Sequence, residues 1–582
     1  MLVSPIRHTR HDGSDDLLSA GLGLSGLQSM QAPAFADVES PSCAEVRRRQ
    51  IWSNWRGIAD LSPGGGYGDV YGAVPHVAGD EFQALLQLPH ARQPHRVLVQ
   101  IPDGYDKHAR CVLVTAVSGS RGIYGAVALA SAWGLPRGCV VASTDKGAGT
   151  GHFDVDSDSG VALEGLRATR GSGLEFEPDS DRSPEHTIAV KHAHSGDNPE
   201  ADWGRHVLQA AQFALEMLAE ARPQEAPFTF SNTRIIGVGL SNGGGAVLRA
   251  AELDRDGCFD GVVAVAPNVY AKSEGGRPLY DYATEAALWH PCALLHPQFD
   301  ALALVRPGGS PLPAGVVRAT ALHEFGWIEA STPAAQANEA VQRLHAVGWT
   351  AKALAAGATS VAFDLWRAVA ICYASAYQRS TAGAMPGGYR YAALDAQARP
   401  RATSSQERML WSTDGGIPPG AAAGIVDGLA TGHDPALPGL RALRDGWAVQ
   451  SSQTEILRAS ILATRCGLPR AGVPLLVVHG IDDGLVPEAF SSIPYVNSLV
   501  QNGLPHAHWR VANAQHFDAL LGLPMLSNSF VPLLPYAYAA LDAMWVHLAG
   551  EQALPRSANI ATTPRSAGKS LRTSDLGMLP PP

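Results

Sequence analysis

Seven short runs of apolar and β-branched residues recur along the chain and predict buried strands. They are Arg96–Ile101, Val112–Val117, Cys139–Ser143, Arg234–Leu240, Gly261–Ala266, Pro474–His479 and Trp509–Asn513. Between them, Val207–Ala221 has apolar positions at helical spacing without Gly or Pro, and Ala246–Leu253 follows three consecutive glycines. Strands that alternate with helices predict an α/β fold, in which helices cover both faces of a mostly parallel sheet.

The same patterns divide the chain into five parts. Residues 1–50 predict an irregular lead-in, and residues 51–268 alternate between strand-like and helix-like stretches. Residues 269–470 are rich in alanine, with helix-like runs that Pro and Gly interrupt. Residues 471–548 return to strand and helix. Residues 549–582 are rich in Pro, Ser and Thr, so we expect a disordered tail.

Composition excludes several classes of protein. With 582 residues, 46% hydrophobic and 17% charged, the balance is that of a globular chain rather than a disordered one. The net charge of −10 argues against a nucleic-acid partner, because phosphate backbones are repelled by an acidic surface. No stretch approaches the ~18 apolar residues of a membrane helix, so an integral membrane protein is not expected.

Neither a metal nor a cofactor is expected. The seven cysteines contain no CxxC spacing, which argues against a zinc or iron–sulfur site, and no disulfide framework is required. The acidic segment 154–158 resembles the start of a calcium loop, but Ser159 and Gly165 stand where Gly and Glu are required. The glycine-rich segment 143–151 lacks the Gly-Lys-Ser/Thr ending of a phosphate-binding loop.

A candidate nucleophile lies between a predicted strand and a predicted helix. The segment 239–243 reads Gly-Leu-Ser-Asn-Gly, the G-x-S-x-G pattern of a nucleophile elbow. Ser241 must occupy a sharp turn to project its hydroxyl, and Gly239 and Gly243 leave room for that turn. The pattern alone is weak in a glycine-rich chain, but this is its single occurrence, and it has the expected strand and helix around it. We therefore expect an α/β-hydrolase-like fold with Ser241 as nucleophile.

In this architecture an acid and then a histidine follow the serine along the chain. The strand 474–479 leads into a loop containing Asp482 and Asp483, and the spacing favours Asp483 as the acid, with Asp482 as the neighbour it is easily confused with. His516 follows the last predicted strand, 33 residues after Asp483, which is the length of about one helix and one strand. His516 would accept the Ser241 proton, and Asp483 would orient its ring.

The oxyanion hole needs two backbone N–H groups. One should come from Asn242, which follows the nucleophile. The other should come from the loop after the strand 112–117, where Gly119, Ser120 and Arg121 are the candidates. The loop contains no His-Gly-Gly motif, so the sequence leaves open which of its N–H groups points inward.

The insertion between nucleophile and acid is large. Ser241 and Asp483 are 242 residues apart, whereas two strands and their helices need well under ~100 residues. We therefore expect residues 269–470 to form a large, mainly helical cap beside the carboxyl edge of the sheet. Its six tryptophans are better explained as the core of the cap than as the lining of an acyl pocket.

With these residues placed, the chain resembles the D-(−)-3-hydroxybutyrate oligomer hydrolases of bacterial polyhydroxybutyrate breakdown. The resemblance covers most of the chain. It rests on four segments: residues 15–23 (DDLLSAGLG), 142–151 (ASTDKGAGTG), 241–252 (SNGGGAVLRAAE) and 562–565 (TTPR).

The resemblance implies a serine esterase that cleaves soluble 3-hydroxybutyrate oligomers to monomers, downstream of a polymer depolymerase and without a cofactor. The active-site serine of the family maps onto Ser241, whereas Asp483 and His516 rest on spacing. Members of the family are generally secreted. This sequence shows no convincing signal peptide, so a cytoplasmic location is the alternative. Arg121 is a candidate partner for the terminal carboxylate of the oligomer, and the sequence does not indicate an oligomeric state.

Two other functions remain open. The first is another esterase of the same fold, similar to feruloyl esterases or tannases, since the glycine-rich loop and the cap would suit such substrates. The second is a catalytically silent protein that binds a granule or a partner, against which the complete order of Ser241, Asp483 and His516 argues.

Overall fold

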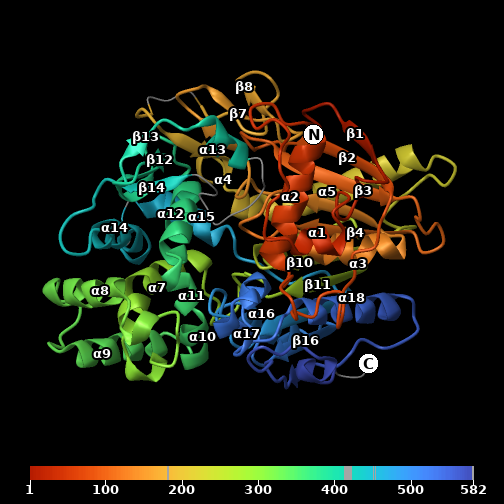
Figure 1. The fold of residues 1–582 in the computed structure, drawn as a ribbon. Coiled ribbons are helices and arrows are strands. Elements are labelled where there is room, and N and C mark those ends of the chain that lie inside the picture. The colour runs from red at the N-terminus through yellow and green to blue at the C-terminus, as the bar shows by residue number, and fades with distance from the viewer. Residues whose placement is uncertain (180–182, 412–422, 450, 452–453, 580–582) are drawn as a thin grey trace.

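The computed structural model describes residues 1–179, 183–411, 423–449, 451 and 454–579. These residues form a central ten-stranded sheet in which all seven predicted strands are present (Figure 1). In sheet order its strands are β1 (Arg7–His11), β2 (Gly79–Leu86), β3 (His95–Pro102), β5 (Val140–Thr144), β4 (Cys111–Ala116), β10 (Arg234–Leu240), β11 (Gly261–Val265), β15 (Leu475–Gly480), β16 (His506–Val511) and β17 (Ala558–Ile560).

The sheet is parallel from β5 to β17, whereas β1, β2, β3 and β5 pair antiparallel. The central strands are buried on both faces, so their sequences are continuously apolar rather than alternating. The carboxyl ends of the parallel strands therefore meet at one edge, where an α/β sheet presents its functional loops.

Helices pack on both faces of this sheet, as the alternation of patterns predicts. Helices α5 and α6 contact each other and the strands of one face, while η1 contacts α2, α3 and α18. Their bounds, with those of the remaining helices around the sheet, are α1 (Gly23–Gln28), α2 (Cys43–Ile58), η1 (Val127–Ser131), α3 (Ala132–Gly134), α5 (Pro199–Ala221), α6 (Asn242–Leu253), α16 (Ser492–Gln501), α17 (Pro524–Ser527) and α18 (Leu534–Leu548). The fold is the α/β arrangement expected, with its mostly parallel sheet between helices.

The insertion after β11 lies beside the sheet (Figure 1), and its side chains build a second hydrophobic core. Its elements are α7 (Leu279–Ala293), α8 (Pro313–Glu324), α9 (Pro333–Ala346), α10 (Ala351–Ala356), α11 (Ala358–Ala362), α12 (Leu365–Gln378), β12 (Tyr389–Leu394), β13 (Pro400–Arg401), α13 (Ser405–Leu410), β14 (Gly424–Asp427), α14 (Leu437–Ala448) and α15 (Glu455–Leu462). We call residues 269–470 the cap.

The cap core also receives side chains from an earlier part of the chain. A four-stranded sheet precedes α4 (Lys191–His194) and packs on the cap through β9 and α4. Its strands are β6 (His152–Asp154), β7 (Ser159–Val161), β8 (Arg167–Thr169) and β9 (Ile188–Val190). Short strands of three residues carry too little periodicity to be detected in the sequence.

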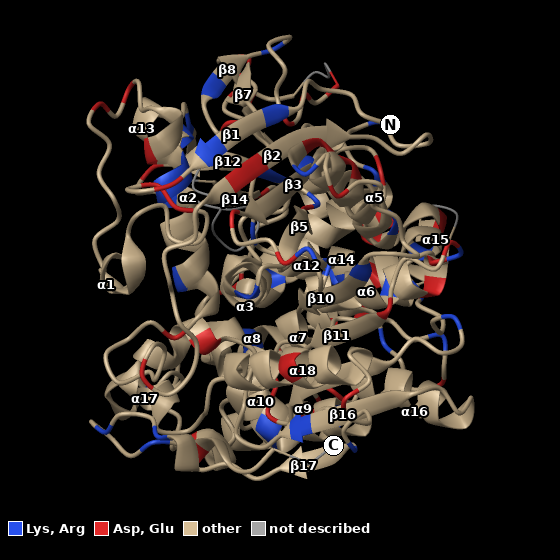
Figure 2. Cartoon of the chain, turned by 90° about the vertical axis from the view of Figure 1, so that its right-hand side faces the viewer, with Lys and Arg blue, Asp and Glu red and all other residues tan. Residues whose placement is uncertain are grey.

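The first 50 residues are not an irregular lead-in. Strand β1 pairs with β2 at the edge of the central sheet, and helix α2 begins at Cys43 with a capping box between Ser42 and Glu45. The prediction was wrong because charged residues of this segment are paired inside the protein, with each other and with β2: Arg47 lies 2.7 Å from Asp15 and 3.2 Å from Glu81. Figure 2 shows the acidic residues of β2 beside the basic residues of β1 and α2.

The expected disordered tail is folded as far as the structure describes it, to residue 579. Strand β17 extends the central sheet by pairing parallel to β16. Arg565 donates to the Leu521 carbonyl at 3.0 Å and to the Asp60 carboxylate at 3.3 Å, and Leu571 is buried. The prediction was wrong because these contacts are made with distant parts of the chain, which composition does not reveal.

The seven cysteines are all unpaired, and Cys111 and Cys139 are buried in the core as expected. Among the described residues, no single helix is long and apolar enough to cross a membrane. The bent pair formed by Ala351–Ala362 and Leu365–Gln378, with 79° between its halves, passes that test only when its two helices are taken together.

The buried pair Arg47–Glu81 allows a test of whether the N-terminal segment stabilises the fold. Replacing Arg47 with Ala leaves the carboxylate of Glu81, which has no exposed surface, without its guanidinium, so we expect unfolding to become easier by about 3–5 kcal/mol. Urea unfolding measures the loss. The matched control is Arg92→Ala, because the pair Arg92–Asp179 is more than half exposed on both sides, and its removal should cost below about 1 kcal/mol. Equal losses of unfolding free energy in the two variants would contradict a stabilising role for the buried pair Arg47–Glu81.

Candidate active site

Ser241 occupies the sharp turn between β10 and α6. Its φ of 60° and ψ of −126° place it outside the conformations that residues with a side chain normally adopt. Two glycines make the turn possible. A Cβ on Gly239 would lie 2.3 Å from the Gly243 carbonyl oxygen, and a Cβ on Gly243 would lie 2.1 Å from the Ala116 carbonyl oxygen. The geometry is therefore that of a nucleophile elbow.

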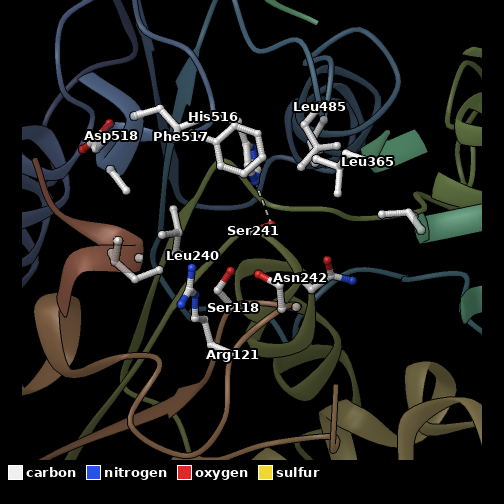
Figure 3. A pocket seen from close by; sticks show the side chains of 18 of the residues that line it. Ser118, Arg121, Leu240, Ser241, Asn242, Leu365, Leu485, His516, Phe517 and Asp518 are labelled. Carbon is white, nitrogen blue, oxygen red and sulfur yellow. Dashed lines mark hydrogen bonds between the residues drawn. The ribbon is translucent and has the colours of Figure 1, made fainter. Parts of the chain in front are cut away.

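The structure brings Ser241, His516 and Asp483 together in one row. His516 Nε2 lies 2.9 Å from Ser241 Oγ, and His516 Nδ1 lies 2.7 Å from Asp483 Oδ2. All three residues are buried, and each comes from the carboxyl end of a strand or the loop after it. Figure 3 shows the ring of His516 directed at the Ser241 hydroxyl. The three residues that the sequence singles out thus meet, although 275 positions separate the first from the last.

Asp483 is held as a carboxylate by its surroundings. Its Oδ1 accepts the backbone N–H groups of Leu485 at 2.9 Å and Val486 at 2.7 Å. His479 Nε2 lies 3.4 Å from Oδ2 and donates to the Val486 carbonyl at 2.9 Å. Burial opposes ionisation of Asp483, but His516 and the hydrogen bonds from both histidines outweigh it and lower the pKa of the carboxyl well below its ordinary value.

Asp482, the neighbour easily confused with the acid, faces the cap instead. Its Oδ1 lies 3.2 Å from Lys352 Nζ at the start of α10. The same loop touches the cap backbone, because a Cβ on Gly484 would lie 2.2 Å from the Gly357 nitrogen. One loop therefore both orients His516 and supports the cap.

The expected oxyanion loop lies against the residue that follows the nucleophile. Asn242 is the first residue of α6, where backbone N–H groups have no acceptor within the helix and the helix dipole favours negative charge. A Cβ on Gly119 would lie 2.5 Å from Asn242 Oδ1, so only glycine allows the loop to approach this closely. Gly119, Ser120, Arg121 and Asn242 all line the cavity that contains Ser241.

That cavity has a volume of about 320 Å³ and lies between the core and the cap. Apolar side chains from both parts form most of its wall (Figure 3): Ile58, Leu240, Leu279, Phe363, Leu365, Val369, Leu485, Val486, Phe517 and Leu520. The six tryptophans of the cap are absent from its lining, and Trp289, Trp349, Trp366 and Trp411 are buried in the cap itself. The cavity thus suits a short, weakly polar acyl chain.

Sequence reasoning missed a polar network directly behind Asn242. Lys146 pairs with Glu200 and donates to the Tyr373 hydroxyl at 2.9 Å, and His192 Nε2 lies 2.7 Å from Glu200 Oε1. Asn242 Nδ2 donates to the same hydroxyl at 2.7 Å and to Glu200 Oε2 at 3.3 Å. Burial would raise the pKa of Glu200, but Lys146 and His192 lower it to about 2, so the network contains a carboxylate.

Two signals for the missed residues were present in the sequence. Lys146 is one of only six lysines and lies in the glycine-rich segment 143–151. Arg56 and Gly57, which also line the cavity, end a helix whose start is marked by Ser42-x-x-Glu45. A Cβ on Gly57 would lie 2.0 Å from the Arg121 guanidinium carbon, so this glycine makes room for Arg121.

The acidic segment that resembles a calcium loop is occupied by protein partners. Arg408 and Thr403 bind Asp154, His186 binds Asp156, and Arg170 binds Asp158. In the described part of the chain, no group of three or more His, Cys, Asp or Glu side chains is arranged to hold a metal ion.

Comparison with solved structures finds similar chains at low identity. Tannin acyl hydrolase from Aspergillus niger is 11% identical, with a TM-score of 0.38 over 88% of this chain and 85% of that one. Feruloyl esterase B from Aspergillus oryzae is also 11% identical, with a TM-score of 0.37 over 79% and 78% of the two chains.

Comparison with protein families and with curated sequences identifies one family. The family model described as 3HB-oligomer hydrolase matches residues 1–578. A D-(−)-3-hydroxybutyrate oligomer hydrolase of Paracidovorax citrulli is 35% identical over 97% of this chain and 89% of its own length. The protein of the same name from Burkholderia pseudomallei strain 1106a is 35% identical over 98% and 90%. The chain therefore belongs to the 3HB-oligomer hydrolase family and is an ester hydrolase.

Proposed function

We propose that this protein is a serine esterase that hydrolyses D-(−)-3-hydroxybutyrate oligomers to the monomer through an acyl-enzyme on Ser241. The observation that carries the proposal is the row Ser241–His516–Asp483, which opens into an apolar cavity between core and cap. The names of the relatives supply the substrate class. Such soluble oligomers are the product of polymer hydrolysis, so the enzyme would act downstream of a depolymerase.

In the first half of the reaction, Ser241 Oγ attacks the ester carbonyl and its proton passes to His516 Nε2. Asp483, a buried carboxylate 2.7 Å from Nδ1, stabilises the imidazolium that forms. The N–H of Asn242 and one N–H of the loop 118–121 would stabilise the oxyanion. The tetrahedral intermediate collapses, the alkoxy oxygen takes the proton from His516, and the shortened oligomer leaves as an alcohol.

In the second half, water attacks the 3-hydroxybutyryl group on Ser241. His516 removes a proton from the water and returns it to Ser241 Oγ as the acyl bond breaks. The sum of the two halves is one ester bond and one water converted to one acid and one alcohol. No cofactor enters this balance.

Arg121 would bind the terminal carboxylate of the oligomer. It lines the cavity as the last residue of the expected oxyanion loop 118–121, with its guanidinium against Gly57 of α2. Arg56 lines the same cavity and donates to the carbonyls of Leu27 and Gln28. A planar guanidinium forms the charge-assisted hydrogen bonds that a carboxylate accepts.

Ser241→Ala should abolish release of 3-hydroxybutyrate from purified trimer, because the nucleophile is lost while the cavity keeps its shape. Chromatography of the products measures the release by wild type and variant. Trimer hydrolysis that persists in the variant would contradict the role of Ser241. If wild type ignored the trimer but cleaved a short p-nitrophenyl ester through Ser241, the mechanism would stand and the substrate assignment would fall.

Asp483→Asn should lower kcat by about 10⁴-fold, because an amide in place of the carboxylate favours the wrong tautomer of His516. Asp482→Asn is the matched control: it removes an equal charge one residue away, in a side chain that faces Lys352, and kcat should change less than about threefold. Steady-state kinetics on a p-nitrophenyl ester gives both values. A larger loss in the Asp482 variant would reverse the assignment of the acid.

Arg121→Ala should raise KM for the anionic trimer by about 10-fold or more and leave KM for a neutral p-nitrophenyl ester nearly unchanged, because only the trimer carries a carboxylate. Initial rates for both substrates over a range of concentrations measure the difference. Equal changes for the two substrates would show that Arg121 supports the cavity wall rather than the substrate charge.

A further inference from the structure

Tyr373 is a cap residue whose hydroxyl reaches the catalytic core. It lies on α12 with Val369 and Leu365, which are four and eight positions before it, so the three side chains share one helix face. All three line the cavity that contains Ser241. Leu365 and Val369 are apolar, so the Tyr373 hydroxyl is the one polar group among these three side chains beside the cavity.

Both acceptor positions of the Tyr373 hydroxyl are occupied. The ammonium of Lys146, which has only donors, lies 2.9 Å from the oxygen. The Asn242 side chain lies 2.7 Å away, and its orientation follows from Glu200: a carboxylate oxygen only accepts, so the Asn242 atom 3.3 Å from Glu200 Oε2 is the amide nitrogen. Asn242 therefore also donates to Tyr373.

A hydroxyl that accepts two hydrogen bonds is left with its own proton to donate. Within the described ranges, the Tyr373 hydroxyl donates to no protein acceptor, although the residue is only 3% exposed. A buried donor without an acceptor is unfavourable, and such groups in a binding cavity are satisfied by the ligand. Because Tyr373 lines the cavity, a bound molecule that reaches this hydroxyl can accept its proton.

We infer that Tyr373 is a specificity-determining residue that donates its hydroxyl proton to the 3-oxygen of the acyl group bound at Ser241. This inference rests on the proposed function. A 3-hydroxybutyryl group has two oxygens that need partners when it is bound. Asn242 and the loop 118–121 serve the carbonyl oxygen, and the 3-oxygen requires a separate donor. A butyryl group has the same carbon chain and lacks that oxygen.

The hydrogen bond from Lys146 to the Tyr373 hydroxyl joins the core to the cap. Lys146 and Glu200 belong to the core, and Lys146 donates to the oxygen of Tyr373, which belongs to the cap. Lys146 is held over the rings of Trp203 and Tyr373, at 4.6 Å and 4.9 Å from their centroids. With its nitrogen fixed in this way, the direction of the Tyr373 proton is fixed as well.

The test compares Tyr373→Phe with wild type on ethyl (R)-3-hydroxybutyrate and ethyl butyrate, with kcat/KM measured by titration of the released acid. We expect the variant to lose about 10-fold in kcat/KM on the hydroxy ester and less than twofold on the butyrate, because only the first substrate loses a hydrogen bond. Equal losses on the two esters, or no loss on either, would overturn the inference.

Tyr377→Phe is the matched control. Tyr377 lies one turn further along α12, is equally buried, stacks edge-on against Tyr373 at 5.9 Å, and is not part of the cavity lining. Removing its hydroxyl should leave the ratio of the two esters unchanged, and a changed ratio would point to a general effect of the helix. Thermal unfolding of both variants checks that they are folded.

A second measurement needs no variant. With wild type, (R)-3-hydroxybutyrate should inhibit ester hydrolysis at about 10-fold lower concentration than butyrate does, and equal inhibition would overturn the inference. The proposed function fails by a different result: Ser241→Ala that still cleaves ethyl butyrate, or wild type that cleaves neither ester.

Discussion

The close packing of helix α6 against the ends of its neighbouring strands is the constraint on which the site depends. Gly243 lies so near the Ala116 carbonyl that a single added carbon would approach it to 2.1 Å, and Gly245 stands in the same relation to Asn268, at 2.0 Å. This proximity forces the chain to turn within one residue, and Ser241 takes up the strain. The hydroxyl then projects beyond the sheet, where His516 meets it.

The site is assembled where two hydrophobic cores meet. One core surrounds the central sheet, and the other holds the cap together with the small sheet that precedes α4. Among the polar connections that cross the boundary, two involve residues next to the site: Lys352 with Asp482 beside the catalytic loop, and Tyr373 with Lys146 and Asn242. The cavity is lined from both parts, so the cap helps to determine its shape, while Ser241, Asp483 and His516 all lie outside the cap.

Two buried carboxylates next to the site have the same role. Asp483 and Glu200 are buried carboxylates whose pKa values are lowered by neighbouring histidines and, for Glu200, by Lys146, against the effect of burial. In both cases the ionised form accepts hydrogen bonds that orient another residue. Asp483 orients His516, and Glu200 orients the amide of Asn242. Each buried charge therefore fixes the orientation of a neighbouring side chain, because a carboxylate accepts stronger hydrogen bonds than a neutral group does.

Local patterns in the sequence were sufficient for the seven strands of the sheet interior and for the elbow, because a strand buried on both faces must be apolar throughout and a one-residue turn must be flanked by glycine. The order of serine, acid and histidine was also sufficient to select the three residues that meet. The start of α2 is marked in the sequence by Ser42 and Glu45, a signal that the prediction of an irregular lead-in did not use.

Tertiary structure alone decided the rest. The edge strand β1 is polar and the edge strand β17 has only three residues, and both are strands because β2 and β16 offer unpaired backbone groups. Spacing already favoured Asp483 over Asp482, and the structure supplies the physical difference: Asp483 faces His516, whereas Asp482 faces the cap. The role of Tyr373 depended on two donors that lie 131 and 227 positions away in the sequence. The direction of a hydrogen bond depends on which groups are neighbours in space, and the order of residues along the chain does not indicate these neighbours.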